Sequence, residues 1–441
     1  MSTLQVGILF GIATFVALFS GMPIAFAVGG VALVFMLLYM PSETVGLVAE
    51  TLYSELDNFV LLTIPLFVLM GAAIGKSRAG GDLYSSLNRW MGRIPGGLGA
   101  ANVMACSVFA AMCGSSPATC SAIGSSGIPE MRKRGYSPGL AAGIIAAGGT
   151  LGILIPPSII LIVYGVLAEE SIGALYMAGV VPGLLLTAMF MAAIAGMALI
   201  RPSIAPREPA VGWREKLRLS VAILPVAVLV FLVLGTIYMG VATPTEAASL
   251  GVVGAFVLAA VSGKVDLRML KETCLNTVNT TAMVILIVSA AFMLNFVLAI
   301  FGVPQAMATM VTNLGWSPNA ILWVLIAFYL VMGTFMDEYS MLVTTIPVVL
   351  PIVKAIGVDL VWFGILITVL VEVALISPPH GLNLFVLHNV RMQSTAKGER
   401  QGTMIDLFLG VLPYMVVMLV LIGLLVAYPA IATWLPAKMR G

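Results

Sequence analysis

Two polar runs interrupt an otherwise apolar chain, and the residue types in them suit the binding of a small hard cation. The first run, Cys113 to Gly127, gathers glycines and hydroxyl residues, and Ser115, Ser116 and Thr119 offer hydroxyl oxygens. Oxygen atoms are the ligands that hard cations prefer in proteins. Small residues also let membrane helices pack closely, so close packing is the alternative explanation of this run.

A pair of prolines breaks an apolar segment after each polar run. The pairs are Pro156–Pro157 and Pro378–Pro379. Proline has no amide N–H and clashes with the carbonyl four residues earlier, so a helix is not expected to continue through either pair. The carbonyls that should be freed are those of Gly152, Ile153, Ala374 and Leu375. Freed carbonyls together with hydroxyls favour Na⁺ as the bound ion.

The second polar run carries two carboxylates where the chain should be apolar. Its polar and small residues are Gly333, Thr334, Asp337, Glu338, Ser340, Thr344 and Thr345, and Ser377, Gly381 and Asn383 flank the proline pair that follows. A carboxylate at membrane depth is costly and is therefore a functional hypothesis by default. Asp337 or Glu338 either completes a cation site or anchors a turn by accepting backbone amides. Glu246 instead follows Thr243 and Thr245 near a helix start, and a cap by one of these threonines is predicted.

The composition predicts a membrane-spanning framework for these motifs. Hydrophobic residues make up 61% and charged residues 9% of the 441 positions, and the mean hydropathy is +1.11. Soluble domains are about one-quarter charged. A helix crosses a bilayer with about 20 apolar residues. We predict spans at 4–20, 23–40, 59–75, 138–167, 174–200, 219–238, 246–262, 279–301, 360–388 and 404–433.

The chain nearly repeats itself at an offset of about 222 residues. Gly152–Pro157 returns as Ala374–Pro379, and Pro23 and Pro244 are separated by nearly the same offset. Interrupted hydrophobic segments in matched halves indicate the binding site of a secondary transporter.

We therefore predict an all-α polytopic membrane protein built from two repeats. Residues 1–200 form the first repeat, 201–218 a cytoplasmic linker and 219–441 the second repeat. Each repeat should contain a re-entrant hairpin, at about 97–131 and 319–356, and a broken helix, at about 138–167 and 360–388. Backbone that leaves the helix at membrane depth must be covered by protein or line a wet cavity. Two ordinary spans joined by a short loop are the alternative to each hairpin.

The placement of basic residues favours re-entry. With the amino terminus outside and both hairpins returning to the side they entered, all of the 21 Lys and Arg residues except Lys354, Lys438 and Arg440 face the cytoplasm. This is the bias that the positive-inside rule requires. The two repeats are then inverted, and no Lys or Arg lies inside the bundle. An anion would therefore meet the half-helix amino termini at Pro157–Ser158 and His380–Gly381, which carry positive dipole ends.

Signatures of other functional classes do not occur in the sequence. The four cysteines form no metal motif, and neither His-Glu-x-x-His nor Asp-Asp-x-x-Asp is present, so we predict no enzyme. A channel would be consistent with re-entrant segments, but a repeated filter sequence is lacking. No nucleic-acid partner is expected, and the lipid bilayer is the surrounding medium.

Five ordered runs resemble the large membrane subunit of tripartite ATP-independent periplasmic (TRAP) transporters. They are Ile64–Gly71, Gly114–Thr119, Gly152–Ser158, Thr243–Ala247 and Pro378–Asn383, and the similarity spans essentially the whole chain. The resemblance implies an elevator-type fold of the ion-transporter superfamily in a bacterial inner membrane. It also implies Na⁺-coupled uptake of an organic acid, in the class of C4-dicarboxylates, 2-oxo acids or sialic acid. Two partners are implied: a small four-helix membrane subunit, expected as a separate chain, and a periplasmic binding protein.

The resemblance also groups the candidate ligands into two Na⁺ sites. The first would use Ser115, Ser116, Thr119, Gly149, Thr150, Ile153 and Pro156, and the second Gly333, Asp337, Thr344, Thr345, Ser377, Pro378 and Gly381. Substrate contacts are expected at Gly114, Ser158, His380 and Asn383. His380 stands where a small apolar residue is expected, and it either meets substrate or a proton or is a hydrogen-bonded structural residue. A stand-alone ion-coupled carboxylate symporter or antiporter of the same superfamily is the alternative function.

Overall fold

A computed structural model of the chain describes residues 3–77, 79–92, 94–205, 223–263, 265–394 and 402–439, with 212, 216, 220 and 221 between them. In these residues the secondary structure is helical, without a strand, which confirms the predicted all-α class. Seven segments among them are long and apolar enough to cross a membrane: Phe59–Lys76, Pro138–Ala168, Ile172–Ile200, Pro244–Val261, Leu267–Ile300, Glu338–Ala355 and Met404–Ala427. Shorter apolar helices accompany them.

The first part of the chain forms helices α1 to α5. Their bounds are Thr3–Phe19 for α1, Ile24–Tyr39 for α2, Ser42–Leu56 for α3, Phe59–Leu62 for the 3-10 turn η1, Thr63–Lys76 for α4 and Ala79–Met91 for α5. Helices α3 and α5 lie outside the predicted spans because they are too polar to be recognised as membrane helices. Helix α3 packs along α15 (Leu267–Ile300), and α5 packs against the first predicted hairpin.

The first predicted hairpin and broken helix are each a pair of helices. The hairpin segment contains α6 (Gly97–Cys113) and α7 (Ser116–Lys133), and the broken segment contains α8 (Pro138–Leu154) and α9 (Ile159–Ala168). Helix α10 (Ile172–Ile200) and the 3-10 turn η2 (Pro202–Ile204) follow. The predicted linker 201–218 lies mostly outside the described residues, so the repeat boundaries stay predictions.

The second half repeats this order of elements. Helices α12 (Leu224–Val230), the π-helical turn η3 (Phe231–Gly235), α13 (Thr236–Tyr238), α14 (Pro244–Val261), α15 and α16 (Val303–Asn313) come first. The hairpin segment then contains α17 (Pro318–Met332) and α18 (Glu338–Ala355), and the broken segment α19 (Leu360–Ile376) and α20 (Leu382–Ser394). Helices α21 (Met404–Ala427) and α22 (Ala430–Met439) end the described chain.

Two predicted spans have wrong bounds. The segment 404–433 is two helices, because α21 ends at Ala427 and Pro429 precedes α22. Helix α15 begins at Leu267 rather than 279, because its polar first turns are stabilised locally. The Asp266 carboxylate accepts the Met269 amide at 2.6 Å, and Arg268 pairs with Glu272 one turn later.

The two broken helices form the centre of the molecule. Helix α8 is buried from Ala141 to Leu154, and α19 is buried from Val361 to Ile376. Helix α8 packs against α6, α7, α10, α19 and α21. We call α6–α9 and α17–α20, with α10 and α21, the central group. Because protein covers the first break and the second borders a cavity at His380, their non-helical backbone is compatible with membrane depth.

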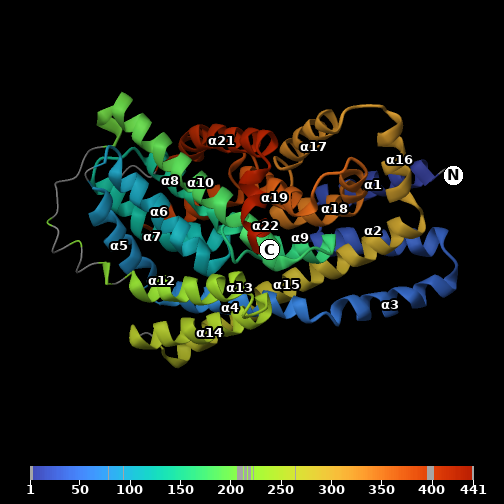
Figure 1. Ribbon diagram of the computed structural model, residues 1–441, viewed down its shortest axis with the longest axis horizontal. Coiled ribbons are helices and arrows are strands. Elements are labelled where there is room, and N and C mark those ends of the chain that lie inside the picture. The colour runs from blue at the N-terminus through green and yellow to red at the C-terminus, as the bar shows by residue number, and fades with distance from the viewer. Residues whose placement is uncertain are drawn as a thin grey trace.

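A second set of helices lies along one side of the central group. Helix α2 packs on α15, α15 on α4, and α4 on α14, and we call these four helices the flanking group. Figure 1 shows α4, α14 and α15 side by side along the lower edge of the molecule. The buried hydroxyls of Thr63 and Thr245 share a hydrogen bond of 2.7 Å between α4 and α14. The predicted cap is confirmed: Thr243 Oγ1 accepts the Glu246 amide at 3.3 Å, and Glu246 accepts the Thr243 amide at 2.8 Å.

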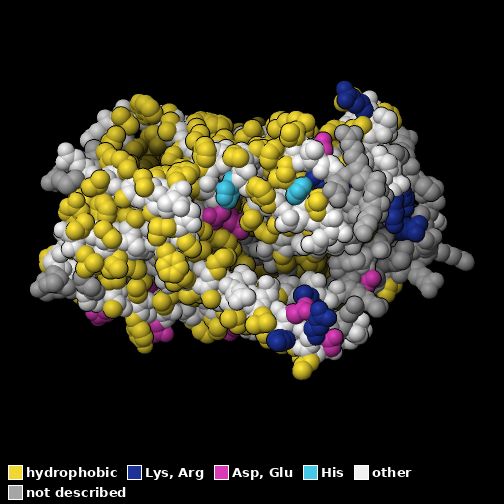
Figure 2. Space-filling view, turned by 180° about the vertical axis from the view of Figure 1, so that it is seen from behind, with side chains coloured by type: hydrophobic (Ala, Val, Ile, Leu, Met, Phe, Trp, Pro, Cys, Tyr) yellow, Lys and Arg dark blue, Asp and Glu magenta, His cyan; other side chains and the backbone are white. Residues whose placement is uncertain are grey.

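Basic side chains are distributed unevenly over the surface. On the face drawn in Figure 2, Lys and Arg gather on the right-hand half. Because this view is turned by 180° from Figure 1, that half is the end of the molecule away from the amino terminus. Arg391 departs from the prediction that no basic residue is buried, since its side chain is inaccessible to solvent. Its guanidinium donates to the carbonyls of Gly402 at 3.1 Å and Thr403 at 3.0 Å, so it joins the end of α20 to the start of α21.

Candidate functional site

The tip of the first hairpin lies directly against the first break. Gly114 adopts a left-handed φ of 63°, and a Cβ atom there would lie 2.5 Å from the Pro157 carbonyl oxygen. A Cβ atom at Gly152 would lie 2.7 Å from the Ser115 carbonyl oxygen. The two backbones therefore approach as closely as glycine alone allows. Residues predicted from separate motifs are brought together, with carbonyl oxygens at their contact.

Asn383, from the second half of the chain, reaches this tip. Its amide nitrogen donates to Ser116 Oγ at 2.8 Å and to the Ala146 carbonyl at 3.3 Å, and Ser116 Oγ also lies 3.1 Å from Asn383 Oδ1. Both side chains are fully buried. Asn383, predicted as a substrate contact, thus links α20 to α7 and α8. Sequence reasoning identified both residues but could not pair them, because they are far apart in the chain.

The remaining hydroxyls of the first predicted site are buried and bond within their own helices. Thr119 donates to the Ser115 carbonyl at 2.8 Å, and Thr150 donates to the Ala147 carbonyl at 2.8 Å. Each oxygen keeps lone pairs that could accept from or coordinate another group. Ser158 caps α9 by accepting the Leu161 amide at 3.4 Å.

Asp337 serves as the N-cap of α18. Its Oδ1 atom accepts the Tyr339 amide at 3.0 Å and the Ser340 amide at 3.1 Å, and its Oδ2 atom accepts the Ser340 hydroxyl. Of the two roles left open by the sequence, the structure shows the amide-accepting one for Asp337. The capped carboxylate also complements the positive end of the helix dipole.

The threonines of the second predicted site tie the hairpin arms. Thr344 donates to the Ser340 carbonyl at 2.7 Å. Thr345 lies 2.6 Å from the Met341 carbonyl and 2.6 Å from the Tyr329 hydroxyl of α17. These hydrogen bonds of the second hairpin come from its own side chains, while α18 also packs on α9 of the first half.

The second break differs from the prediction in one of the carbonyls that were expected to be free. The Ser377 amide donates to the Ala374 carbonyl at 3.2 Å, so that carbonyl is not free as predicted. The Gly381 amide donates to the Ser377 carbonyl at 2.9 Å. Gly333 packs on α19, where a Cβ atom would lie 2.7 Å from the Ala374 Cβ. Pro379 and His380 are exposed, and His380 lines a pocket of about 190 Å³ with Asp337.

A larger polar cavity lies between the central and flanking groups. Its volume is about 730 Å³, and Ser115, Pro117, Ile159 and Tyr339 line its central-group side. Pro117, Ile159 and Tyr339 stand in the first turns of α7, α9 and α18. Three helix amino termini therefore converge on one cavity. The α18 terminus is already capped, because Asp337 accepts the Tyr339 and Ser340 amides. An anion is therefore favoured at the amino termini of α7 and α9, which carry partial positive charge.

The flanking-group side of this cavity is also polar. Lys76 ends α4, and Glu272, Asn276 and Thr280 follow one another at four-residue spacing along α15. Residues four apart share a helix face. Sequence reasoning missed these residues, although the four-residue spacing was visible in the chain. Lys76 also corrects the prediction that no basic side chain faces the interior.

Glu372 is a buried carboxylate beside the first site. It is fully inaccessible, and neither of its carboxylate oxygens has a hydrogen-bond partner among the described residues. Thr150 of α8 is its neighbour across the α8–α19 contact. Thr150 and Glu372 stand at the repeat offset, so equivalent positions of the two broken helices meet.

Known proteins resemble this chain over nearly its whole length. The family model described as tripartite ATP-independent periplasmic transporter, DctM component, matches residues 12–431. A C4-dicarboxylate TRAP transporter large permease protein DctM of Pseudomonas aeruginosa is 38% identical over 401 residues, covering 91% of each chain. A sialic acid TRAP transporter large permease protein SiaM of Vibrio cholerae is 31% identical, covering 96% of this chain and 97% of that protein.

Two further similarities concern length and fold. An isethionate TRAP transporter permease protein DctMQ of Oleidesulfovibrio alaskensis is 35% identical over 95% of this chain, which corresponds to 63% of that longer protein. The crystal structure of the Alcanivorax borkumensis YdaH transporter has a TM-score of 0.63 at 14% identity, covering 95% of this chain and 98% of that one. The latter similarity is one of fold alone.

Proposed function

Because this chain belongs to the DctM component family of TRAP transporters, whose members are multi-pass membrane permeases, we propose that it carries a small organic acid inward with Na⁺. The observation that carries the proposal is the meeting of the α7 and α9 amino termini at the large cavity. A carboxylate placed there would accept backbone amides without needing a basic side chain beside it.

The substrate is proposed to be an organic acid of the C4-dicarboxylate, 2-oxo acid or sialic acid class. The names of two relatives support this choice, since one is a C4-dicarboxylate and the other a sialic acid permease. Substrates of both kinds bear a carboxylate, which matches the positive helix ends. Gly114 lies at the first hairpin tip and Ser158 at the start of α9, both next to the large cavity, whereas His380 lines the smaller pocket.

Na⁺ is proposed to bind at two places. The first is the contact between the first hairpin tip and the first break, where the Ser115 carbonyl approaches Gly152 and Ser116 and Thr119 add hydroxyls. The second is the region of Gly333, Asp337, Thr344 and Thr345 with the break from Ser377 to Gly381. Hydroxyls and carbonyls at helix breaks coordinate Na⁺ in secondary transporters.

The movement is proposed to be of the elevator type. The central group would slide as a body against the flanking group, since the hairpins and broken helices pack on one another and the large cavity lies beside their contacts with α4 and α15. The proposed partners are a periplasmic binding protein and a small membrane subunit on a separate chain. The relative named DctMQ is longer than this chain, which supports a test for a small subunit fused to the large one as well as for a separate chain.

Uptake into proteoliposomes tests the proposal. The vesicles would hold this chain with its small subunit, and labelled succinate, 2-oxoglutarate or N-acetylneuraminate would be added with and without binding protein and an inward Na⁺ gradient. Uptake that needs both additions is expected. Uptake of the same acid without the binding protein would favour the stand-alone carrier, and uptake indifferent to Na⁺ would contradict the coupling.

A further inference from the structure

We propose that Lys76 and Glu272 form an exchange gate at the flanking side of the large cavity, where the carboxylate of a departing substrate replaces that of Glu272 on Lys76. The inference rests on the proposed function, because it requires an anionic cargo. It assigns a second anion-binding position, distinct from the α7 and α9 amino termini at the other side of the cavity.

The geometry places a lysine and a carboxylate on the wall of the cavity itself. Lys76 Nζ lies 2.7 Å from Glu272 Oε2, and both side chains line the cavity that reaches Ser115. Their side chains are 49% and 38% exposed, so solvent and solutes can reach the pair. Glu272 therefore shows how a carboxylate binds Lys76 at this position.

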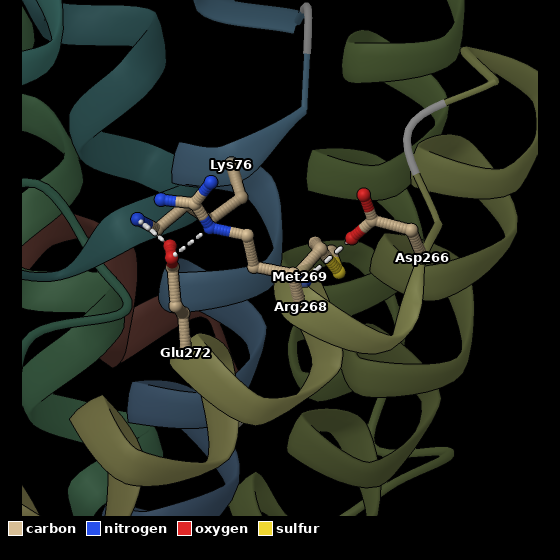
Figure 3. A network of polar contacts seen from close by, with 5 residues as sticks. All are labelled: Lys76, Asp266, Arg268, Met269 and Glu272. Atoms are coloured by element: carbon tan, nitrogen blue, oxygen red, sulfur yellow. Dashed lines mark hydrogen bonds and ion pairs between the residues drawn. The ribbon is translucent and has the colours of Figure 1, made fainter.

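Arg268 gives Glu272 a second partner. Arg268 Nε donates to Glu272 Oε1 at 2.9 Å, while Lys76 holds the other carboxylate oxygen. Figure 3 shows Glu272 between the two cations, whereas Asp266 points to Met269 at the start of α15. When Lys76 changes partner, Glu272 keeps its bond to Arg268 and is not left unpaired. Because Glu272 and Asp266 both act on Arg268, Lys76 is the cation left for an incoming anion once it changes partner.

The solvent exposure of the Lys76–Glu272 pair lowers the free energy that the exchange requires. Solvent-exposed ion pairs contribute only about 0–1 kcal/mol, so replacing one carboxylate by another needs little free energy. A lysine is a flexible point charge with three donors, which suits transient contact better than rigid recognition. Asn276 and Thr280 continue the polar face of α15 along the cavity wall and offer hydrogen bonds between the hairpin tips and Lys76.

A purely structural tie between α4 and α15 is the competing role, and the two roles predict different signs. If the pair only joins the helices, Lys76→Gln and Glu272→Gln both remove the bond between them and shift the inhibition in the same direction. If the pair exchanges partners with substrate, Lys76→Gln removes the binding group, whereas Glu272→Gln removes its internal competitor.

The test measures how substrate on the cytoplasmic face inhibits uptake. Proteoliposomes would hold the full transporter with its cytoplasmic face toward the lumen, loaded with graded concentrations of whichever acid the wild type takes up from labelled succinate, 2-oxoglutarate and N-acetylneuraminate. Lys76→Gln is expected to raise the half-inhibitory luminal concentration about tenfold, since a hydrogen bond to a charged group is lost. Glu272→Gln is expected to lower it about threefold.

Controls separate this inference from the proposed function and from misfolding. Lys271→Gln removes an exposed charge from the neighbouring position of α15, which does not line the cavity. This variant should change the half-inhibitory luminal concentration less than about twofold. Lys76→Arg should keep nearly wild-type inhibition if the fold is intact. Shifts of the same sign for Lys76→Gln and Glu272→Gln, or an equal shift for Lys271→Gln, would overturn the gate. Failure of the wild type to take up any of the acids would overturn the proposed function itself.

Discussion

The two helix breaks at the centre of the molecule are enclosed to different extents. Ile155 to Ser158 in the first break are all buried, whereas Pro379 and His380 in the second are exposed. The first hairpin tip meets its break backbone to backbone and is held by Asn383 from the other half of the chain. The second hairpin is held by its own residues, through the Asp337 cap and the Tyr329–Thr345 contact.

This difference indicates different freedom of movement in the two hairpins. A tip that is locked by contacts from both halves cannot open without breaking several buried hydrogen bonds, each of which is costly to leave unmade. A tip whose hydrogen bonds come from its own side chains can move as a unit and keep those bonds. We therefore expect the first hairpin to be a preformed site and the second to be the more mobile one.

The equivalent positions Thr150 and Glu372 sharpen the contrast. The first broken helix carries a hydroxyl that bonds to its own backbone, and the second carries a carboxylate without a hydrogen-bond partner among the residues described. The two halves of the chain thus bring two chemically different groups to one contact. Burying a polar group without a partner costs stability, so the carboxylate is a departure from what packing alone would select.

The largest expected contrast concerns the side of the membrane from which a reagent can reach each hairpin. Cysteines introduced at Lys133, at the end of α7, and at Lys354, near the end of α18, are both exposed. If the hairpins open to opposite faces, an impermeant thiol reagent outside the cell should label only position 354. Cys274 is exposed and would first be replaced by serine, whereas the other three cysteines are buried. Labelling of both positions, or of 133 alone, would contradict the inverted topology.

Gly114→Ala should strongly disrupt the first site. The substitution places a Cβ atom in a left-handed conformation and 2.5 Å from the Pro157 carbonyl oxygen. Strain and overpacking together should cost about 3 kcal/mol or more, and transport should be lost. Thermal unfolding of the purified protein would measure the change. Gly357→Ala is the matched control: its φ of +73° is also left-handed but no atom lies within 4 Å, so a cost of about 1 kcal/mol is expected. Equal effects of the two would argue against close contact at the first tip.

Ser116→Ala with Thr119→Ala should weaken Na⁺ dependence. Both hydroxyls are fully buried at the first tip, and their removal takes two oxygen ligands from the proposed site. We expect the Na⁺ concentration for half-maximal uptake to rise about tenfold, as for the loss of interactions worth about 1.4 kcal/mol. Ser125→Ala, on the exposed face of α7 where the hydroxyl donates to the Ala122 carbonyl, should leave this Na⁺ concentration unchanged. An unaltered Na⁺ requirement in the double variant would remove these residues from the site.

Asp337→Ala should have the smallest effect on stability. The residue caps α18 through two backbone amides, and the loss of an N-cap costs about 0.5–2 kcal/mol. Asp337→Asn should restore most of this stability, because asparagine is an equally good cap. Na⁺-dependent uptake would be measured on both variants. If Asn restores the melting temperature but not the Na⁺ dependence, the charge of Asp337 also belongs to the second cation site; if it restores both, Asp337 is a cap only.

Local features of the fold could be predicted from the sequence because their causes are local. Paired prolines stop a helix wherever they occur, and the breaks after Leu154 and Ile376 lie where they were predicted. The Thr243–Glu246 cap also depends only on residues three apart. Helices α3, α5 and α16 were missed because a search for apolar spans does not recognise polar or short helices.

By itself, the sequence determined the class of protein, the two broken helices and the candidate ligands, since hydropathy, proline geometry and residue spacing act along the chain. Tertiary structure decided which residues meet. It paired Asn383 with Ser116, brought Lys76 and Glu272 to a cavity shared with Ser115, and placed Thr150 beside Glu372. These contacts join segments up to 267 positions apart. Their formation depends on the packing of whole helices against one another, which no local pattern specifies.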